Sequence, residues 1–168
     1  LKWTETVGST SRAFQIYLKA QETPVIEQDS FAGLVRDARL KLKAMDPRKY
    51  LQTQTTVTGA SGAVNTGTYD TPILITITAS GATSTALTLI RIKSTGYDAI
   101  YVTTALANNE SLVIDTWNHS VKLNNVEKRG LLGNNSIWFT LSPGTNILTY
   151  NNGANMTITW KYNSSWPI

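Results

Sequence analysis

Residues near the end of the chain alternate strictly between apolar and polar side chains. From 156 to 162 one set is apolar or aromatic and the other is threonine and lysine: Met156, Ile158, Trp160 and Tyr162 against Thr157, Thr159 and Lys161. Successive side chains point to opposite faces of a β-strand, whereas an α-helix repeats about every 3.6 residues. Residues 155–162 are therefore predicted to form a half-buried strand, and a helix is excluded there.

The rest of the last third predicts further strands separated by tight turns. The expected strands are residues 112–115, 120–123, 137–141 and 146–150. Residues 116–119 turn the chain between the first two, and Pro143-Gly144 and Asn152-Gly153 mark later turns. Proline fixes φ, glycine tolerates a positive φ, and an Asn-Gly step suits a hairpin turn. These patterns predict an antiparallel sheet.

The middle of the chain continues the same organisation. Strands are predicted at residues 72–78, 86–93 and 97–103, and an edge strand is predicted around 55–57 inside a Thr/Ser/Gly-rich crossing that ends at Gly67. Strands that recur about every 8 to 15 residues, with a turn between each pair, are typical of a sandwich or barrel. We therefore predict an all-β, antiparallel β-sandwich with roughly eight or more strands after Thr53.

The first 45 residues give a weaker pattern. Residues 1–12 are polar without periodicity and are expected to contain a loop at 8–11, and residues 14–20 alternate as a strand. Residues 31–38 have helical spacing weakened by Gly33, the alternative being a loop that runs into a strand at 38–44. Asp46-Pro47 is the predicted boundary, because proline cannot continue a β-ladder. We expect an arm or the remainder of an N-terminal domain at 1–45, with one or two strands, and the sandwich at 46–168.

Composition excludes several classes of function. The chain has 168 residues, no cysteine, one histidine and a net charge of +4. Its basic residues are interleaved with apolar or acidic ones and lack a platform of adjacent aromatics, so no nucleic-acid partner is predicted. No apolar run approaches the ~20 residues that span a bilayer. The chain begins at Leu1 without methionine, from which we expect a fragment of a longer protein.

Three segments in order resemble siphophage distal tail proteins. The first, residues 41–50, reads KLKAMDPRKY, and the second, residues 65–77, has Asn-Thr-Gly-Thr followed by Pro72 and an apolar strand. The third is the last third of the chain, with an Ile-Asp strand end at 114–115, Lys-Leu-Asn-Asn at 122–125, Pro-Gly-Thr-Asn at 143–146, and a strand into Trp160-Lys161.

This resemblance implies a virion structural protein of a long-tailed phage, located at the tail tip and made in the bacterial cytoplasm. Its C-terminal domain would be a galectin-like, or jelly-roll-like, sandwich. The full-length protein would be a homo-hexameric hub whose N-terminal ring domain binds the tail tube. The C-terminal domain would hold other tail proteins, baseplate or receptor-binding proteins. That ring domain is longer than residues 1–45, so this chain alone is expected to be monomeric.

A carbohydrate-binding module for host-surface adhesion is the alternative function. Sugars bind to sandwich modules by stacking on aromatic rings flanked by hydrogen-bonding side chains. The candidate contacts, for a host-wall saccharide or for a protein partner, are Asp115, Trp117, Asn118, His119 and Trp160. Trp117 is the tryptophan placed in a turn. Trp138 and Trp160 have apolar strand neighbours, and burial in the core is the competing interpretation for both.

Neither catalysis nor a cofactor is predicted. His119 lies four residues after Asp115, and the two could form an acid–base pair, but the sequence places no nucleophile beside them. Glu110 and Asp115 could form a carboxylate pair, but nothing fixes their separation. A single histidine without cysteine does not match the usual zinc sites, and Asn124, Asn125 and Glu127 are better explained as turn residues than as metal ligands. The chain is therefore not expected to be an enzyme or to bind a metal.

Overall fold

The computed structural model describes residues 2–7, 10–15, 18–20, 25–28, 35–39, 42–44, 48–83, 86–93 and 96–167. The chain divides into two compact units: residues 1–52 with 167–168, and residues 53–166. The predicted domain boundary at 45/46 lies outside the described residues and stays a prediction. Within the described residues, no helix has the length and apolar character needed to cross a lipid bilayer.

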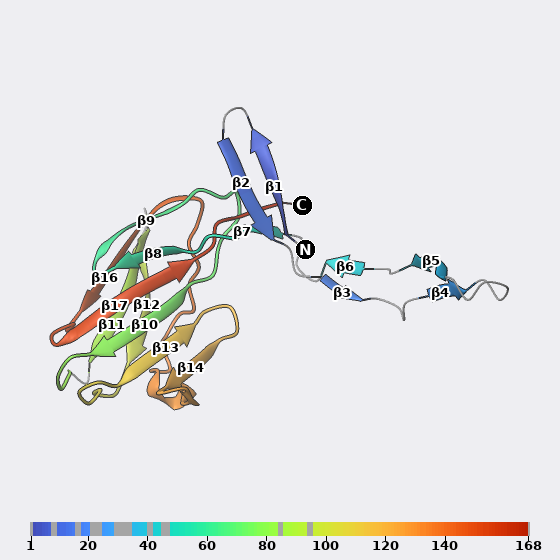
Figure 1. The fold of residues 1–168 in the computed structure, drawn as a ribbon. Helices are drawn as coiled ribbons and strands as arrows, with labels where there is room; N and C mark the ends of the chain where they lie inside the picture. The colour runs from blue at the N-terminus through green and yellow to red at the C-terminus, as the bar shows by residue number, and fades with distance from the viewer. Residues whose placement is uncertain are drawn as a thin grey trace. The chain divides into compact units, whose positions relative to one another are not determined.

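The first unit contains seven strands among its described residues (Figure 1). They are β1 (Lys2–Val7), β2 (Thr10–Gln15), β3 (Leu18–Ala20), β4 (Val25–Gln28), β5 (Val35–Arg39), β6 (Leu42–Ala44) and β7 (Arg48–Leu51). All the pairings are antiparallel: β2 pairs with both β1 and β7, β3 pairs with β6, and β4 pairs with β5. The described strands of this unit are joined by backbone hydrogen bonds within these antiparallel pairs.

Three expectations for this unit are wrong. Residues 10–11, the second half of the loop predicted at 8–11, belong to β2, which pairs with β1 in a continuous register from Lys2–Gln15 to Val7–Thr10. Val35–Arg39 is a strand and not part of a helix, because it pairs with β4. The segment holds β1 to β6 before Pro47, and not one or two strands. Residues 8, 9 and 31–34, on which the predicted loop and helix start fell, lie outside the described residues.

The second unit is a β-sandwich of two antiparallel sheets (Figure 1). Its elements are β8 (Thr55–Thr58), β9 (Ser61–Asn65), β10 (Leu74–Ala79), β11 (Leu87–Lys93), β12 (Gly96–Val102), β13 (Ser111–Asp115), β14 (Ser120–Leu123), β15 (Val126–Glu127), η1 (Arg129–Leu131), β16 (Gly144–Asn151) and β17 (Met156–Tyr162), and β18 (Ser165–Pro167) follows. One sheet has the order β15-β14-β13-β10-β17-β8, and the other has the order β12-β11-β16-β9. The predicted all-β antiparallel sandwich is confirmed.

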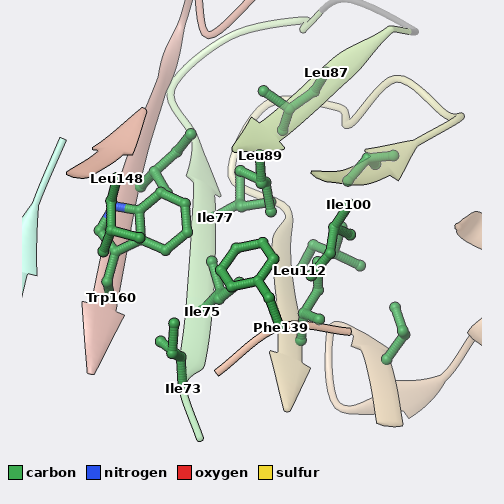
Figure 2. Packing of buried hydrophobic residues seen from close by; sticks show 14 of the residues in the cluster. Ile73, Ile75, Ile77, Leu87, Leu89, Ile100, Leu112, Phe139, Leu148 and Trp160 are labelled. Atoms are coloured by element: carbon green, nitrogen blue, oxygen red, sulfur yellow. The ribbon is translucent and has the colours of Figure 1, made fainter. Parts of the chain in front are cut away.

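The core lies between these sheets and follows the alternation read from the sequence. In β17, Ile158, Trp160 and Tyr162 are buried, while Thr157 is exposed. Figure 2 shows Trp160 and Phe139 among isoleucines and leucines of both sheets. Fully burying each such side chain contributes about 1.5–3 kcal/mol relative to leaving it in water. Tyr162 also donates from its hydroxyl to the carbonyl of Val64 at 3.1 Å, and its burial raises the pKa of that hydroxyl.

Two strand predictions in this unit need correction. Residues 137–141 do not form a strand, because their backbone groups bind different segments. The N–H of Ile137 donates to the carbonyl of Ala99, and Leu141 forms an isolated β-bridge with Thr71. The Thr/Ser/Gly-rich crossing that ends at Gly67 holds a second strand besides the predicted edge strand, namely β9, which pairs with β16. The predicted edge strand at 55–57 is β8, which does lie at the edge of the six-stranded sheet.

Candidate functional site

The turn between β13 and β14 is held in place by one carboxylate. Oδ1 of Asp115 accepts the backbone N–H groups of Trp117 at 2.9 Å and Asn118 at 3.1 Å, and Oδ2 accepts the side-chain amide of Asn118 at 2.7 Å. His119 then takes a positive φ of 50°, which lets the chain reverse into β14. The turn is therefore fixed by its own hydrogen bonds, and Asp115 is occupied as their acceptor.

Two aromatic side chains come together beside this turn from distant parts of the sequence. His119 stacks on the half-buried Trp138, with ring centroids 5.0 Å apart and planes at 24°. The guanidinium of Arg129 lies 5.9 Å from the centre of the same ring, within the range of a cation–π contact. Trp117 is 48% exposed on the turn itself. We call Trp117, His119, Arg129 and Trp138 the aromatic turn cluster.

The aromatic turn cluster has the features of a recognition surface. The exposed indole of Trp117 can stack on a flat or apolar ligand surface, and Asn118 on the turn and Arg129 in η1 are also exposed. Asp115 is engaged by the turn, and no nucleophile contacts His119 among the interactions of the described residues. Within the same described ranges, no three or more His, Asp or Glu side chains gather in a way that could hold a metal ion.

Trp160, the fifth candidate contact, lies elsewhere. Its side chain is 0% exposed in the sandwich core, and its indole N–H donates to the carbonyl of Gly59 at 2.9 Å. A ligand cannot reach it in this structure, so its role is packing. The structure therefore brings together Asp115, Trp117, Asn118 and His119 but not Trp160.

Sequence reasoning missed two members of the aromatic turn cluster. Trp138 was interpreted as core because Ile137 and Phe139 flank it, yet Ile137 is exposed and Trp138 is only half-buried. Arg129 lies in η1 and carried no motif. Both contacts depend on how residues 124–138 fold back toward the β13–β14 turn, and a single sequence holds no local pattern for that.

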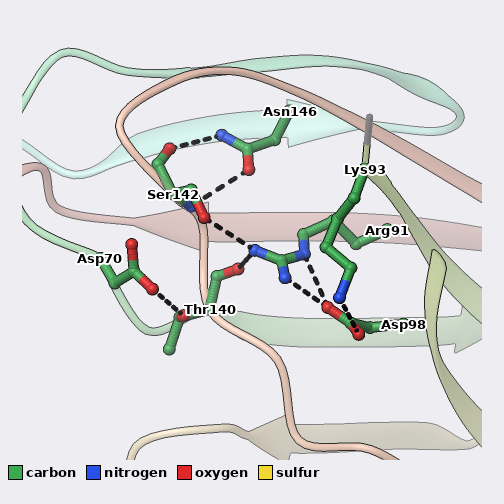
Figure 3. Close-up of polar contacts among 7 residues, drawn as sticks. All are labelled: Asp70, Arg91, Lys93, Asp98, Thr140, Ser142 and Asn146. Carbon is green, nitrogen blue, oxygen red and sulfur yellow. Dashed lines mark hydrogen bonds and ion pairs between the residues drawn. The ribbon is translucent and has the colours of Figure 1, made fainter. Parts of the chain in front are cut away.

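A second group of polar side chains lies inside the four-stranded sheet (Figure 3). Arg91 on β11 and Asp98 on β12 face each other in register and form an ion pair with side chains 9% and 10% exposed. Lys93 donates to the other carboxylate oxygen at 2.7 Å. Burial alone would raise the pKa of Asp98, but the hydrogen bonds and charges of Lys93 and Arg91 outweigh it and lower that pKa. Asp98 is therefore a carboxylate at neutral pH.

This polar group also holds the segment that precedes β16 (Figure 3). Arg91 donates to the carbonyl of Thr140 and to the hydroxyl of Ser142. Asn146 accepts from the N–H of Ser142 at 3.1 Å and donates to its carbonyl at 2.8 Å. Asn65 donates to the carbonyl of Leu141 at 2.9 Å. The buried side-chain nitrogen and oxygen atoms of the described residues all have partners, so this group is a structural anchor.

Comparison with known proteins identifies the fold and the family. The chain resembles the crystal structure of the Dit protein of SPP1, presented as a paradigm of the hub adsorption apparatus in Gram-positive-infecting phages, with a TM-score of 0.65 and 16% sequence identity. The match covers 95% of this chain but spans 61% of the SPP1 Dit chain. At this identity the likeness shows a shared fold. No curated protein sequence matches the chain.

A family model for the C-terminal domain of the siphovirus-type tail component matches residues 66–166, which is most of the β-sandwich. Its matched range includes the aromatic turn cluster and, apart from Asn65, the polar group around Arg91 and Asp98. The resemblance to siphophage distal tail proteins is thereby confirmed, and the chain belongs to the siphovirus-type tail component family.

Proposed function

We propose that this chain is part of a hub at the distal end of a siphophage tail, where its sandwich holds other tail proteins. The observation that carries the proposal is the family match over residues 66–166, and the fold shared with SPP1 Dit supports it. The role is structural and not enzymatic. The virion tail tip is the site of action, and synthesis in the bacterial cytoplasm precedes assembly.

The mechanism of such a hub is geometric. A rigid sandwich keeps its connecting loops in fixed positions, and loops on a rigid scaffold are where binding residues concentrate. In the full-length protein, a homo-hexameric ring would present several copies of this sandwich at once. Several weak contacts made together hold a partner far more firmly than one does, because later contacts form at a high effective concentration. Baseplate or receptor-binding proteins would be attached in this way.

The aromatic turn cluster is the best candidate for the docking contact within the sandwich. Tryptophan and arginine are enriched among the residues that dominate protein interfaces. The hydrogen bonds of Asp115 fix the turn before a partner arrives, so little conformational freedom is lost on binding. Trp117 therefore meets a partner from a preorganised position.

Immunogold electron microscopy of the phage that encodes this chain tests the hub proposal. Antibodies against the purified chain should label the tail tip, with one cluster of gold particles on each virion. Label along the tail tube or on the capsid would contradict it. Virions carrying Trp117→Ala should show fewer baseplate proteins by quantitative mass spectrometry, and Tyr69→Ala, another exposed aromatic, should leave their number unchanged.

A second candidate function is adhesion to a host-wall saccharide, and the exposure of Trp117 favours it. Trp117 is 48% exposed on the turn, and its indole offers a flat apolar surface of the kind on which sugars stack. A glycan array should give a saturable signal that Trp117→Ala removes and Trp117→Phe keeps in part, because phenylalanine retains a stacking surface. Silence across host-wall glycans would exclude adhesion and leave the hub proposal unaffected.

A further inference from the structure

The four-stranded sheet has an apolar row on its outer face. Tyr97 pairs with Ile92 across β12 and β11, and Ile92 pairs with Ile147 across β11 and β16. Val64 on β9 lies on the same face and pairs with Thr145, which precedes Ile147 by two residues in β16. These four side chains are exposed by 61% (Tyr97), 44% (Ile92), 51% (Ile147) and 51% (Val64). We call them the apolar row.

Each residue of the apolar row is adjacent in sequence to a buried polar residue. The four adjacent residues are Asn65, Arg91, Asp98 and Asn146, and each is at most 7% exposed. The usual arrangement, with apolar side chains inside and polar ones outside, is thus reversed at one position in all four strands. The buried set is held by the hydrogen bonds to residues 140–142 described above, so these strands cannot turn over to hide the apolar row.

The outer face around the apolar row carries no charge among its described residues. Its other members in the register are uncharged: Gly62, Thr88, Ile90, Ala99, Tyr101, Thr145, Thr149 and Asn151, of which Ala99 is buried at 2% exposure. The outer face of the six-stranded sheet differs, because Asp115, Lys122 and Lys161 lie on it. Water readily solvates the charged outer face of the six-stranded sheet, whereas the outer face of the four-stranded sheet exposes a continuous apolar strip.

We propose that this uncharged face packs against the same face of a second copy of the chain. A two-fold interface is isologous, so the same patch must complement itself. Like charges would meet across such an interface, and this face has none to repel. Two twisted sheets can pack face to face with their strands roughly aligned, which would bring the apolar rows of the two copies together.

The size of the face makes the association weak. Four strands about 4.8 Å apart, over roughly 20 Å of their length, give on the order of 400 Å² per copy. The total is below the roughly 1,200 Å² at the lower end of standard interfaces. A dilute chain is then monomeric, as the sequence led us to expect, and dimers form as the concentration rises.

Sedimentation velocity of the wild-type chain tests the proposal, which does not depend on the hub. The average mass should rise from 18.4 kDa toward twice that value between roughly 10 µM and 1 mM. Ile147→Lys should weaken self-association at least tenfold. Thr157→Lys adds the same charge on the exposed outer face of the other sheet and should leave association unchanged. Circular dichroism checks that both variants fold.

A charge-swap experiment identifies the face directly. Ile147→Lys and Ile147→Glu should each be monomeric, and an equimolar mixture should recover dimers, because opposite charges then meet across the two-fold axis. A wild-type chain that keeps one mass over the whole concentration range would overturn the proposal. So would dimers that Thr157→Lys weakens as much as Ile147→Lys does. Gold label at the tail tip would stand in either case, so failure here is separate from failure of the hub proposal.

Discussion

Side chains alternate between the two faces in both sheets of the sandwich, but the sheets differ in which residues are buried at one position of each strand. The six-stranded sheet buries isoleucine, leucine and tryptophan and keeps Asp115, Lys122 and Lys161 on its outer side. At one position in each of its strands, the four-stranded sheet buries a polar residue and exposes an apolar one. Alternation therefore shows which residues share a face. Which face is buried depends on partners elsewhere, here the backbone and hydroxyl groups of residues 140–142.

The largest loss of stability is expected from a substitution in the core of the six-stranded sheet. Trp160→Ala should lower the free energy of unfolding by about 3–5 kcal/mol, because a large ring leaves a cavity in a close-packed core. The indole donor to Gly59 is lost as well. Urea denaturation followed by fluorescence measures the change, with Trp117→Ala as the exposed control. A loss below about 1 kcal/mol would show that Trp160 is not part of the packed core.

Removing the buried ion pair of the four-stranded sheet should cause the next largest loss of stability. Asp98→Ala removes the acceptor of Arg91 and Lys93 and leaves Arg91 buried without its counter-charge. Leaving one partner of a buried pair uncompensated costs about 3–5 kcal/mol, and we expect the lower end because Arg91 keeps Thr140 and Ser142.

A double variant sharpens this result. Arg91→Met combined with Asp98→Leu should be more stable than Asp98→Ala alone, because no charge then stays buried. Denaturation curves of Arg91→Met, Asp98→Leu and the double variant give the coupling between the sites. If Asp98→Ala and the double variant lose equal stability, packing and not charge would explain the role of this pair.

A smaller effect should appear on acidification. The pKa of Asp98 is lowered in the folded chain from its ordinary value of 3.8. Its contribution to stability is therefore fully present above the unfolded pKa and is lost as the pH falls through the folded one. The stability difference between wild type and Asp98→Asn should be constant near neutral pH and shrink below about pH 4. A difference that grows on acidification would contradict the lowered pKa.

The fold of the larger unit was predictable because local alternation and turn residues mark most of its strands. Met156 to Tyr162 alternate in the sequence, and Asn152-Gly153 turns the chain before them. The first unit was not predictable in the same way. β1, for example, is defined by its pairing with β2, because residues 1–12 carry no periodic apolar face.

The candidate site divides along the same line. Asp115, Trp117, Asn118 and His119 adjoin in sequence, so a turn rule could place them together. Arg129 and Trp138 join them only through the fold of the intervening segment. The reversed polarity of Arg91 and Ile92 escaped the sequence for a further reason. An Arg-Ile-Lys run alternates equally well with either face inside, and only hydrogen bonds to residues 140–142 decide between them.

The smallest effect, and the sharpest contrast between the sheets, is expected at the apolar row. Ile92→Thr keeps the branched side chain that suits a strand and replaces an exposed methyl-bearing surface with a hydroxyl. Its cost to the free energy of unfolding should stay within about 0.5 kcal/mol, since surface substitutions away from special features usually do. The measurement belongs at dilute protein, because self-association would stabilise the folded state by mass action. A loss near that of Trp160→Ala would mean that Ile92 serves the core after all. A negligible loss would mean that folding does not require this isoleucine on the surface, and that the reason for its exposure lies in what the face contacts.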